Sequence, residues 1–296
     1  MLDFACENPR VLRTDVVVDR DGVLLADLAC HHATGRGRAA QLRHAIVFVR
    51  RGCFVRSADG LESVLDPAVA YCMNPGEEER YDHPRPDGDD CTWLRLDSDL
   101  VASLAGGDPA LPAQPIPTSG EIDLRHRLLL AAARRGTNPH ELVERAIVLA
   151  SRLLSQAEPR QVQAGWPATA RARRAAADSV REALTASLDR SLPELARDVA
   201  VSPHHLSRIF HSVTGTTISR YRRRLRARRA LERLAAGDRD LARLAFELGF
   251  ADQSHLCRVL RVETGQIPSA LRRALAQPAP AGGSSKSAHG IPEPVG

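Results

Sequence analysis

The chain has 296 residues, 43% of them hydrophobic and 26% charged, which excludes a wholly disordered chain and favours two packed domains over one. Its net charge of +5 is unevenly distributed. Residues 171–276 carry 21 arginines against 11 acidic residues, whereas residues 1–170 carry 19 arginines against 24 acidic residues. The longest apolar runs fall far short of the roughly 18 residues that span a bilayer, and no basic or apolar leader is visible. We therefore expect a cytoplasmic protein without a membrane partner, whose C-terminal part meets a polyanion.

Short apolar and β-branched runs, broken by turn residues, characterise the first hundred residues. The runs that favour strands cover residues 16–18, 46–49, 53–55, 69–73 and 91–96. Turn signals lie between them at Gly52, at Gly60 and at residues 74–76, which read Asn-Pro-Gly. Six of the eleven aromatic residues also lie in this part, and this enrichment predicts a small sheet or barrel.

Helical signals replace the strand pattern after a connection at residues 105–120 that is rich in proline and glycine. Residues 122–135 and 139–155 carry apolar residues at helical spacing. Two roles remain open for these amphipathic helices, since they can cover the sheet or mediate self-association.

Composition then divides the chain. A linker is predicted at residues 157–168, and the tail at residues 277–296 has a disordered composition. The predicted fold class is α+β, with a β-rich barrel and its flanking helices in residues 1–156 and an all-α domain in residues 169–276.

Two short amphipathic helices joined by a tight turn occur twice in the all-α domain. In the first pair Ser202 caps the second helix, Pro203 fits its first turn, and Gly215 ends it. In the second pair Gly249 supplies the turn and Asp252 is expected to serve only as the N-cap. A helix-turn-helix whose second helix is polar on its outside is the arrangement that lays a recognition helix in the major groove.

An arginine-rich helix at residues 219–236 joins the two pairs. Its apolar residues Tyr221, Leu225, Leu231 and Leu234 are expected to face inward. Seven of its arginines are expected to point mostly outward: Arg222, Arg223, Arg224, Arg226, Arg228, Arg229 and Arg233. Eighteen helical residues form a rod of about 27 Å. With the width of a subdomain at each end, this rod sets the recognition helices about one DNA turn apart, roughly 34–36 Å.

These motifs resemble the DNA-binding domain of the AraC/XylS family of transcription regulators. The resemblance covers residues 191–275 and is most specific at residues 202–210 (SPHHLSRIF) and 245–258 (AFELGFADQSHLCR). It implies seven helices with two helix-turn-helix subdomains, preceded by a cupin-like ligand-binding and dimerising domain. The chain departs from the family's pattern at Leu256, Leu260 and Ile267, which we expect to affect packing detail more than function.

Motif position places DNA contacts on the outer faces of the recognition helices and on the rod. The candidates are His204, His205, Ser207 and Arg208 on the first helix, Gln253, Ser254, His255 and Arg258 on the second, and Arg222 and Arg223 on the rod. Arginine can donate twice to guanine, glutamine pairs with adenine, and serine or histidine contacts a base or a phosphate. For the rod arginines, phosphate contact and simple solvation both remain open.

Cysteine and histidine residues of the N-terminal half offer another candidate site. They are Cys30, His31, His32, His44, Cys53, Cys72, His83 and Cys91. Their linear spacing matches no metal-binding motif, and His31 and His32 would point to opposite faces of a strand. We therefore expect structural or ligand-pocket roles, with no metal and no cofactor, and keep a metal or redox site as the alternative.

The chain is thus interpreted as a sequence-specific DNA-binding transcription regulator, not an enzyme, controlled by a small-molecule effector bound to its N-terminal domain. The expected partners are double-stranded DNA, the effector, a second copy of the chain in a homodimer, and RNA polymerase. One alternative is a DNA-repair alkyl acceptor or glycosylase that uses the helix-turn-helix units for delivery, although neither Cys72 nor Cys91 stands in a matching motif. The other is a ligand-independent dimeric DNA binder.

Overall fold

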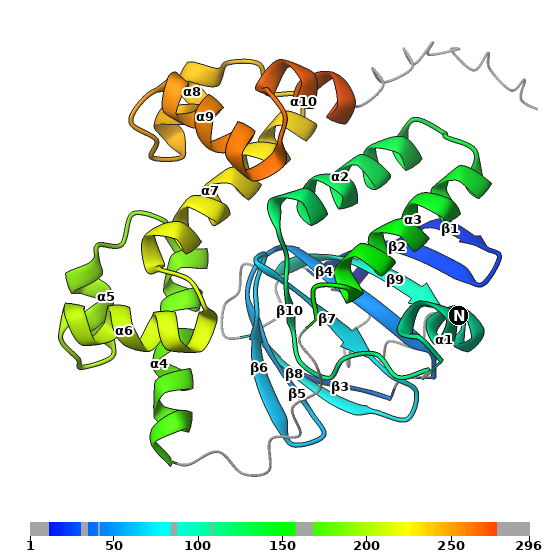
Figure 1. Ribbon diagram of the computed structural model, residues 1–296, viewed down its shortest axis with the longest axis horizontal. Coiled ribbons are helices and arrows are strands. Elements are labelled where there is room, and N and C mark those ends of the chain that lie inside the picture. The colour runs from blue at the N-terminus through cyan, green and yellow to red at the C-terminus, as the bar shows by residue number, and fades with distance from the viewer. Residues whose placement is uncertain are drawn as a thin grey trace, which may run out of the picture.

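Two antiparallel sheets form the N-terminal half of the molecule (Figure 1). The structure is a computed structural model, and it describes residues 12–30, 35–40, 42–83, 88–107, 109–157 and 168–276. One sheet has six strands in the order β1-β2-β9-β4-β7-β10, and the other has four in the order β3-β8-β5-β6. The strands are β1 (Leu12–Arg20), β2 (Val23–Cys30), β3 (Gly35–Ala40), β4 (His44–Arg51), β5 (Phe54–Ala58), β6 (Leu61–Leu65), β7 (Val69–Met73), β8 (Glu78–His83), β9 (Asp89–Leu96) and β10 (Ile116–Pro117).

The six-stranded sheet is covered on both faces. In β4, Val47 belongs to the core between the two sheets, whereas Ile46 and Phe48 belong to the core under the helices. Successive side chains of a strand point to opposite faces, so a strand covered on both sides needs apolar residues at every position. This explains why residues 46–49 form a continuous apolar run instead of an alternating one.

Three helices cover the outer face of this sheet: α1 (Ser98–Ala105), α2 (Gly120–Arg134) and α3 (Pro139–Leu154). Leu142, Ala146, Leu149 and Leu153 of α3 all lie in the core beneath them. The apolar stripe of α3 is therefore buried against the sheet, which confirms the covering role. The self-association role stays a prediction.

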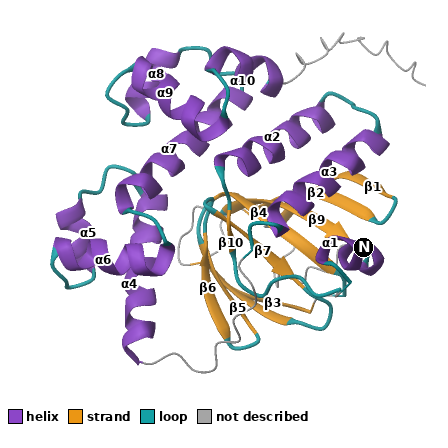
Figure 2. Cartoon of the chain, viewed as in Figure 1, coloured by secondary structure: helices purple, strands orange, loops and turns teal. Residues whose placement is uncertain are grey.

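In the described part of the C-terminal half, helices joined by loops are the one kind of secondary structure (Figure 2). Its helices are α4 (Ala168–Ala186), α5 (Leu192–Asp198), α6 (Pro203–Thr214), α7 (Ile218–Ala235), α8 (Leu241–Glu247), α9 (Gln253–Thr264) and α10 (Pro268–Leu275). The long α7 runs between the pair α5–α6 and the pair α8–α9, so one helix-turn-helix unit lies at each of its ends (Figure 1). Among the described residues, none of the helices combines the length and apolarity needed to cross a lipid bilayer.

The two halves share their cores. Ala68, in the turn before β7, belongs to the apolar core of α4, α5, α6 and α7. Leu124 of α2 belongs to the core formed by α7, α8, α9 and α10. At a third place, a Cβ added to Gly120 would stand 2.0 Å from the carbonyl oxygen of Glu263, so only glycine permits this approach of α2 to α9. The strands β1–β10 and the helices α1, α2 and α3 are together called the β-domain below. The β-domain thus packs against both helix-turn-helix units.

The predicted fold class is confirmed, as are the five predicted strand segments and the two predicted helices that follow them. Five strands (β2, β3, β6, β8 and β10) and helix α1 were not predicted, and β10 lies within the segment expected to be an irregular connection. In β8, the buried Glu79 and Tyr81 alternate with exposed charged residues, so the segment reads as a polar loop. The tail predicted at residues 277–296, and all of the predicted linker except its two end residues, lie outside the described residues.

The buried His126 on α2 gives a test of this packing. Its ring stacks on Phe48 at a centroid distance of 4.6 Å, and its Nε2 has no hydrogen-bond partner among the described residues. Burial, reinforced by nearby arginines, lowers the pKa of His126 well below its usual value. The unfolded chain therefore binds a proton below about pH 6.5 that the folded chain does not bind, and stability falls as the pH drops below that value.

We expect the free energy of urea unfolding to fall by about 1.4 kcal/mol more in the wild type than in His126→Phe between pH 7.5 and 5.5. The phenylalanine keeps a ring against Phe48 but does not titrate. Equal losses in the two proteins would show that His126 is not held neutral by its surroundings.

Candidate nucleic-acid interface

The first helix-turn-helix unit is built from α5 and α6. A capping box between Ser191 and Glu194 starts α5. The hydroxyl of Ser202 then accepts a hydrogen bond from the backbone N–H of His205 at 3.2 Å, and α6 ends at Gly215 with φ of 66°. The turn and the cap, both visible in the sequence, fix where α6 begins and which of its faces is exposed.

The second unit repeats this construction with α8 and α9. Asp240 caps α8, and Asp252 caps α9 by accepting a hydrogen bond from the backbone N–H of His255 at 2.6 Å. Gly249 lies in the turn with φ of 69°, and a Cβ added there would stand 2.8 Å from the guanidinium of Arg226. The N-cap role predicted for Asp252 is confirmed.

Six of the predicted contact residues are exposed on the two recognition helices. They are His204, His205 and Arg208 on α6, and Gln253, Ser254 and Arg258 on α9. The structure gives their side chains no hydrogen bond or ion pair with other described residues. They are therefore free to bond to a ligand without breaking an internal contact.

The other two candidates on these helices have internal partners. The hydroxyl of Ser207 donates to the Pro203 carbonyl oxygen at 3.0 Å, and Nδ1 of His255 faces the Ala251 N–H at 3.3 Å. Arg261, which is not among the predicted DNA contacts, is also exposed and lies three residues after Arg258. Helical periodicity places residues i and i+3 on the same face, so Arg261 shares the outer face of α9 with Arg258.

The arginines of α7 differ most from expectation. Arg228 is 4% exposed and donates to the Thr118 carbonyl oxygen at 2.6 Å, so the outward orientation predicted for it is wrong. Arg222 is half-buried and donates to the Arg190 carbonyl oxygen, while Arg229 donates to the Thr185 carbonyl oxygen at 2.5 Å. These arginines fasten α7 to its neighbours.

The two arginines of α7 that are predicted to contact DNA, Arg222 and Arg223, differ in burial and in electrostatic surroundings. Burial, together with the nearby Arg226, lowers the pKa of Arg222. Arg223 remains exposed, and its Nε lies 3.7 Å from the Glu263 carboxylate. Of the two, Arg223 has the more exposed side chain, and among the described residues its one ion pair is the loose one with Glu263.

A buried carboxylate connects the β-domain to the helices. Asp66, which is fully buried, accepts a hydrogen bond from Nε of Arg181 at 2.8 Å and another from the Tyr221 hydroxyl. Burial and the Asp66 carboxylate raise the pKa of Tyr221 well above its usual value, so the phenol stays a neutral donor. Because Arg181 lies on α4 and Tyr221 on α7, this contact attaches the turn between β6 and β7 to both helices.

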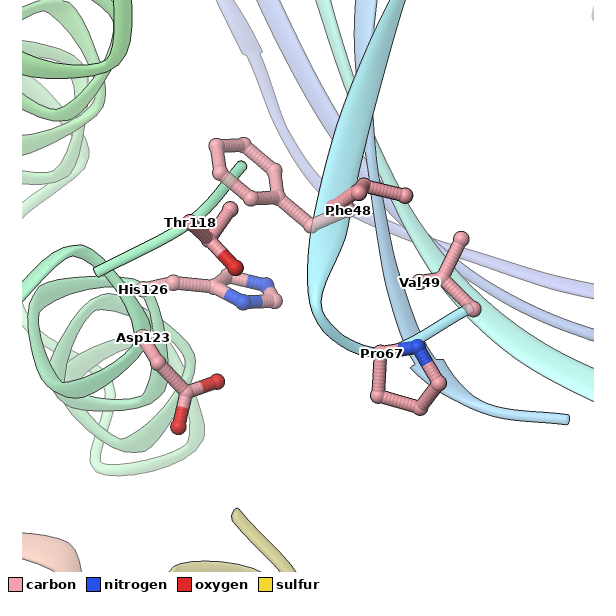
Figure 3. Close-up of a pocket in the computed structure, with 7 residues that line it drawn as sticks. Phe48, Val49, Pro67, Thr118, Asp123 and His126 are labelled. Carbon is pink, nitrogen blue, oxygen red and sulfur yellow. The ribbon is translucent and has the colours of Figure 1, made fainter. Parts of the chain in front are cut away.

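A small crevice lies beside this attachment. It is lined in part by Phe48, Pro67, Thr118, Asp123 and His126. Figure 3 shows the side chains of Asp123 and His126 reaching from α2 toward the strands across the crevice. Thr118 also accepts the hydrogen bonds of Arg228, so the wall of the crevice is continuous with the contact to α7.

The space between the two sheets contains charged and phenolic groups. Nε of Arg56 donates to Glu79 at 2.8 Å, its Nη2 donates to Glu77 at 2.9 Å, and its guanidinium lies 5.3 Å from the ring centroid of Tyr71. The Tyr81 hydroxyl donates to Glu79. Burial raises the pKa of Glu79, although the charge of Arg56 acts in the opposite direction.

The predicted cysteine and histidine candidates lie in several places. Cys53 and Cys72 are buried in different parts of the β-domain, and Nδ1 of His44 lies 3.3 Å from the side-chain oxygen of Asn74. His31 and His32 fall outside the described residues. Cys30, His83 and Cys91 lie at one end of the sheets, near Asp89.

Comparisons with known proteins give a family match within the C-terminal helices. Residues 195–274 match the family model described as a helix-turn-helix domain. The HTH-type transcriptional regulator GlxA of Rhizobium meliloti (strain 1021) is 27% identical over 253 residues, which make up 84% of this chain and 71% of that protein.

Two solved structures are similar to the chain over very different shares of its length. ToxT from Vibrio cholerae O395 aligns with a TM-score of 0.35 and 9% identity over 90% of this chain and 98% of that one. The cupin domain of an XRE family transcriptional regulator from Enterobacter cloacae aligns with a TM-score of 0.27 and 11% identity over 29% of this chain and 96% of that one.

The attachment through Asp66 predicts a large stability loss when it is removed. In Asp66→Ala, the phenol of Tyr221 and the mostly buried guanidinium of Arg181 lose their shared acceptor, although Asp178 still pairs with Arg181. We expect the free energy of unfolding to fall by about 3 kcal/mol, as when one partner of a buried ion pair is removed.

The matched control is Glu141→Ala, which removes an ion pair with Arg145 on the exposed surface of α3. This change should lower the free energy of unfolding by about 0.5 kcal/mol or less, with both variants measured by urea titration. Similar losses in the two variants would mean that the contact of Asp66 does not hold the halves together.

Proposed function

We propose that this chain, whose C-terminal segment is an AraC-type helix-turn-helix domain, is a transcriptional regulator that reads a specific DNA sequence through α6 and α9. A small-molecule effector bound to the N-terminal domain would control it. The observation that carries the proposal is the set of six exposed side chains on the two recognition helices that have no internal partner among the described residues. Groups of this kind supply base and phosphate contacts in the major groove.

The division of roles follows from the chemistry of each side chain. Arg208 and Arg258 occupy corresponding positions on α6 and α9, six residues after the capping residue, and each can donate twice to a guanine. Gln253 can pair with adenine in the same bidentate fashion. His204, His205, Ser207, Ser254 and His255 complete the proposed contacts to bases or phosphates, and Arg223 adds a phosphate contact from the rod.

Control by an effector is supported by the way in which the halves are joined. Several attachments reach the C-terminal helices from the β-domain, among them Asp66 to α4 and α7, Thr118 to α7, and Gly120 to the end of α9. An effector that binds one arrangement of the β-domain better than another would raise the population of that arrangement, and the attachments to the helices would differ between the arrangements. The relative placement of α6 and α9, and hence the affinity for DNA, would follow.

The space between the sheets is the region where we propose that the effector binds. Buried charged groups cost free energy unless they are paired, and such groups gather where a protein binds or transforms a ligand. The network of Arg56, Glu79 and Tyr81 supplies donors and acceptors inside an otherwise apolar lining. A homodimer, a contact with RNA polymerase and a cytoplasmic location are supported by the family resemblance alone.

The alkyl-acceptor alternative needs a cysteine that is readily ionised. Burial raises the pKa of Cys72 to about 12, and burial together with Asp89 raises that of Cys91 well above its usual value. Both effects disfavour the thiolate at neutral pH, so neither residue supports an acceptor function.

Base reading by Arg258 provides the direct test of this function. An operator would be selected from a random duplex library by repeated binding to the full chain. Arg258→Ala should then weaken binding to that operator by about 1–3 kcal/mol and relax the preference at one base position, because one bidentate contact is lost.

Arg273→Ala, which removes an exposed arginine of α10, is the matched control and should keep the preference at every position. If Arg258→Ala weakened binding to all sequences equally, Arg258 would be a phosphate contact instead. If the wild-type chain selected no sequence at all, the proposed function itself would be wrong.

The rod arginine gives a second test, by salt dependence. Replacing Arg223 with alanine should lower the slope of log affinity against log salt concentration by about one unit, since one phosphate contact releases about one counterion. Arg145→Ala on α3 should leave the slope unchanged. An unchanged slope in Arg223→Ala would instead assign Arg223 to its ion pair with Glu263.

A further inference from the structure

Three side chains from three strands meet at one end of the β-domain. The sulfur of Cys30, a ring nitrogen of His83 and a carboxylate oxygen of Asp89 all lie within 4.8 Å of one another. Cys30 ends β2 and is paired directly with Asp89 at the start of β9, in the six-stranded sheet. His83 ends β8 in the four-stranded sheet. The cluster therefore bridges the two sheets.

Contacts within the cluster orient these groups. Nε2 of His83 lies 2.8 Å from Oδ1 of Asp89, and the thiol of Cys91 lies 3.2 Å from Oδ2 of the same carboxylate. Cys30 and Asp89 are each 7% exposed and Cys91 is 4% exposed. The donor atoms are thus gathered in a nearly closed site whose carboxylate is held on both of its oxygens.

We propose that Cys30, His83 and Asp89 bind a divalent transition-metal ion of the zinc type. Thiolate, imidazole and carboxylate are the three ligand types that zinc accepts, at distances of about 2.0–2.3 Å. Ligand atoms around one tetrahedral ion then stand roughly 3–4 Å apart, so a small contraction of the cluster is enough. The sulfur and nitrogen ligands select zinc and its neighbours over magnesium or calcium, which prefer oxygen.

Binding has a definite proton balance. The Cys30 thiol releases its proton to solvent and binds as thiolate, His83 binds through a neutral ring nitrogen, and Asp89 binds as carboxylate. No atom of the protein or the metal changes its oxidation state. Three protein ligands leave the fourth tetrahedral position for water or for an oxygen or nitrogen atom of another ligand.

Cys91 acts as a positioning residue in this site. Hydrogen bonds from outside the coordination sphere fix the orientation of metal ligands, and losing one typically weakens metal affinity 10- to 100-fold. Its contact with Oδ2 of Asp89 leaves Oδ1 directed at His83. The metal would join β2 and β9 to β8 at the end of the domain, in addition to the pairing within each sheet.

The experiment uses the full chain, purified under reducing conditions, stripped with a chelator and titrated with Zn²⁺ or Co²⁺. We expect one bound metal per chain by elemental analysis, and a thiolate-to-cobalt absorption band in the Co²⁺ form. Cys30→Ser should abolish this band, and both Cys30→Ser and His83→Gln should weaken Zn²⁺ affinity at least 100-fold. Cys91→Ser should keep the band and weaken affinity about 10- to 100-fold.

Cys257→Ser is the matched control, because it removes a thiol from α9, outside the β-domain, and should bind metal as the wild type does. Equal affinity of Cys30→Ser and Cys257→Ser would overturn the proposal, as would a wild-type chain that binds no Zn²⁺ at micromolar concentration.

A second measurement does not depend on the folding of any variant. In the wild-type chain, Zn²⁺ should slow the alkylation of Cys30 at least tenfold, read by peptide mass spectrometry, while alkylation of Cys257 stays unchanged. Equal rates of Cys30 alkylation with and without Zn²⁺ would likewise reject the site.

Discussion

One buried carboxylate, that of Asp66, holds the β-domain against the C-terminal helices. A carboxylate that is removed from water must be paired or hydrogen-bonded, and the two side chains that satisfy Asp66, Arg181 and Tyr221, lie on α4 and α7. Two residues further along, Ala68 enters the apolar core of the first helix-turn-helix unit. The turn between β6 and β7 is therefore joined by polar and by apolar contacts to the helices that pack around α6.

Buried charges need partners in the arginine-rich C-terminal domain as well, and this need decides which arginines are exposed. The charge count alone indicates a basic surface, but Arg228, Arg229 and Arg222 donate to backbone carbonyl oxygens of neighbouring segments. An arginine that donates to a carbonyl oxygen of a neighbouring segment has fewer of its five N–H groups left for a phosphate. The arginines of the domain thus form two groups. Those of α7 that bond to backbone carbonyl oxygens hold neighbouring segments together, whereas others, such as Arg208 and Arg258, are exposed on the recognition helices.

Sequence reasoning succeeded where the signal is local. The caps at Ser202 and Asp252 depend on residues three positions apart, so the starts of α6 and α9 could be predicted. It failed for β8, because the burial of Glu79 depends on Arg56, a residue 23 positions away. It named Cys30 and His83 among the candidate metal ligands but could not group them with Asp89, since the three residues come from three strands and show no short ligand spacing.

The sequence by itself determined the α+β class, the two helix-turn-helix units and the polar side chains on their outer faces, because periodicity, capping and turn chemistry act over a few residues. The tertiary structure decided which arginines are buried, how the β-domain attaches to α4, α7 and α9, and which cysteine, histidine and aspartate residues meet. These outcomes depend on contacts between distant segments, such as the Arg228 contact with Thr118. A buried charge is stable only where the fold supplies its partner, and no local pattern encodes that partner.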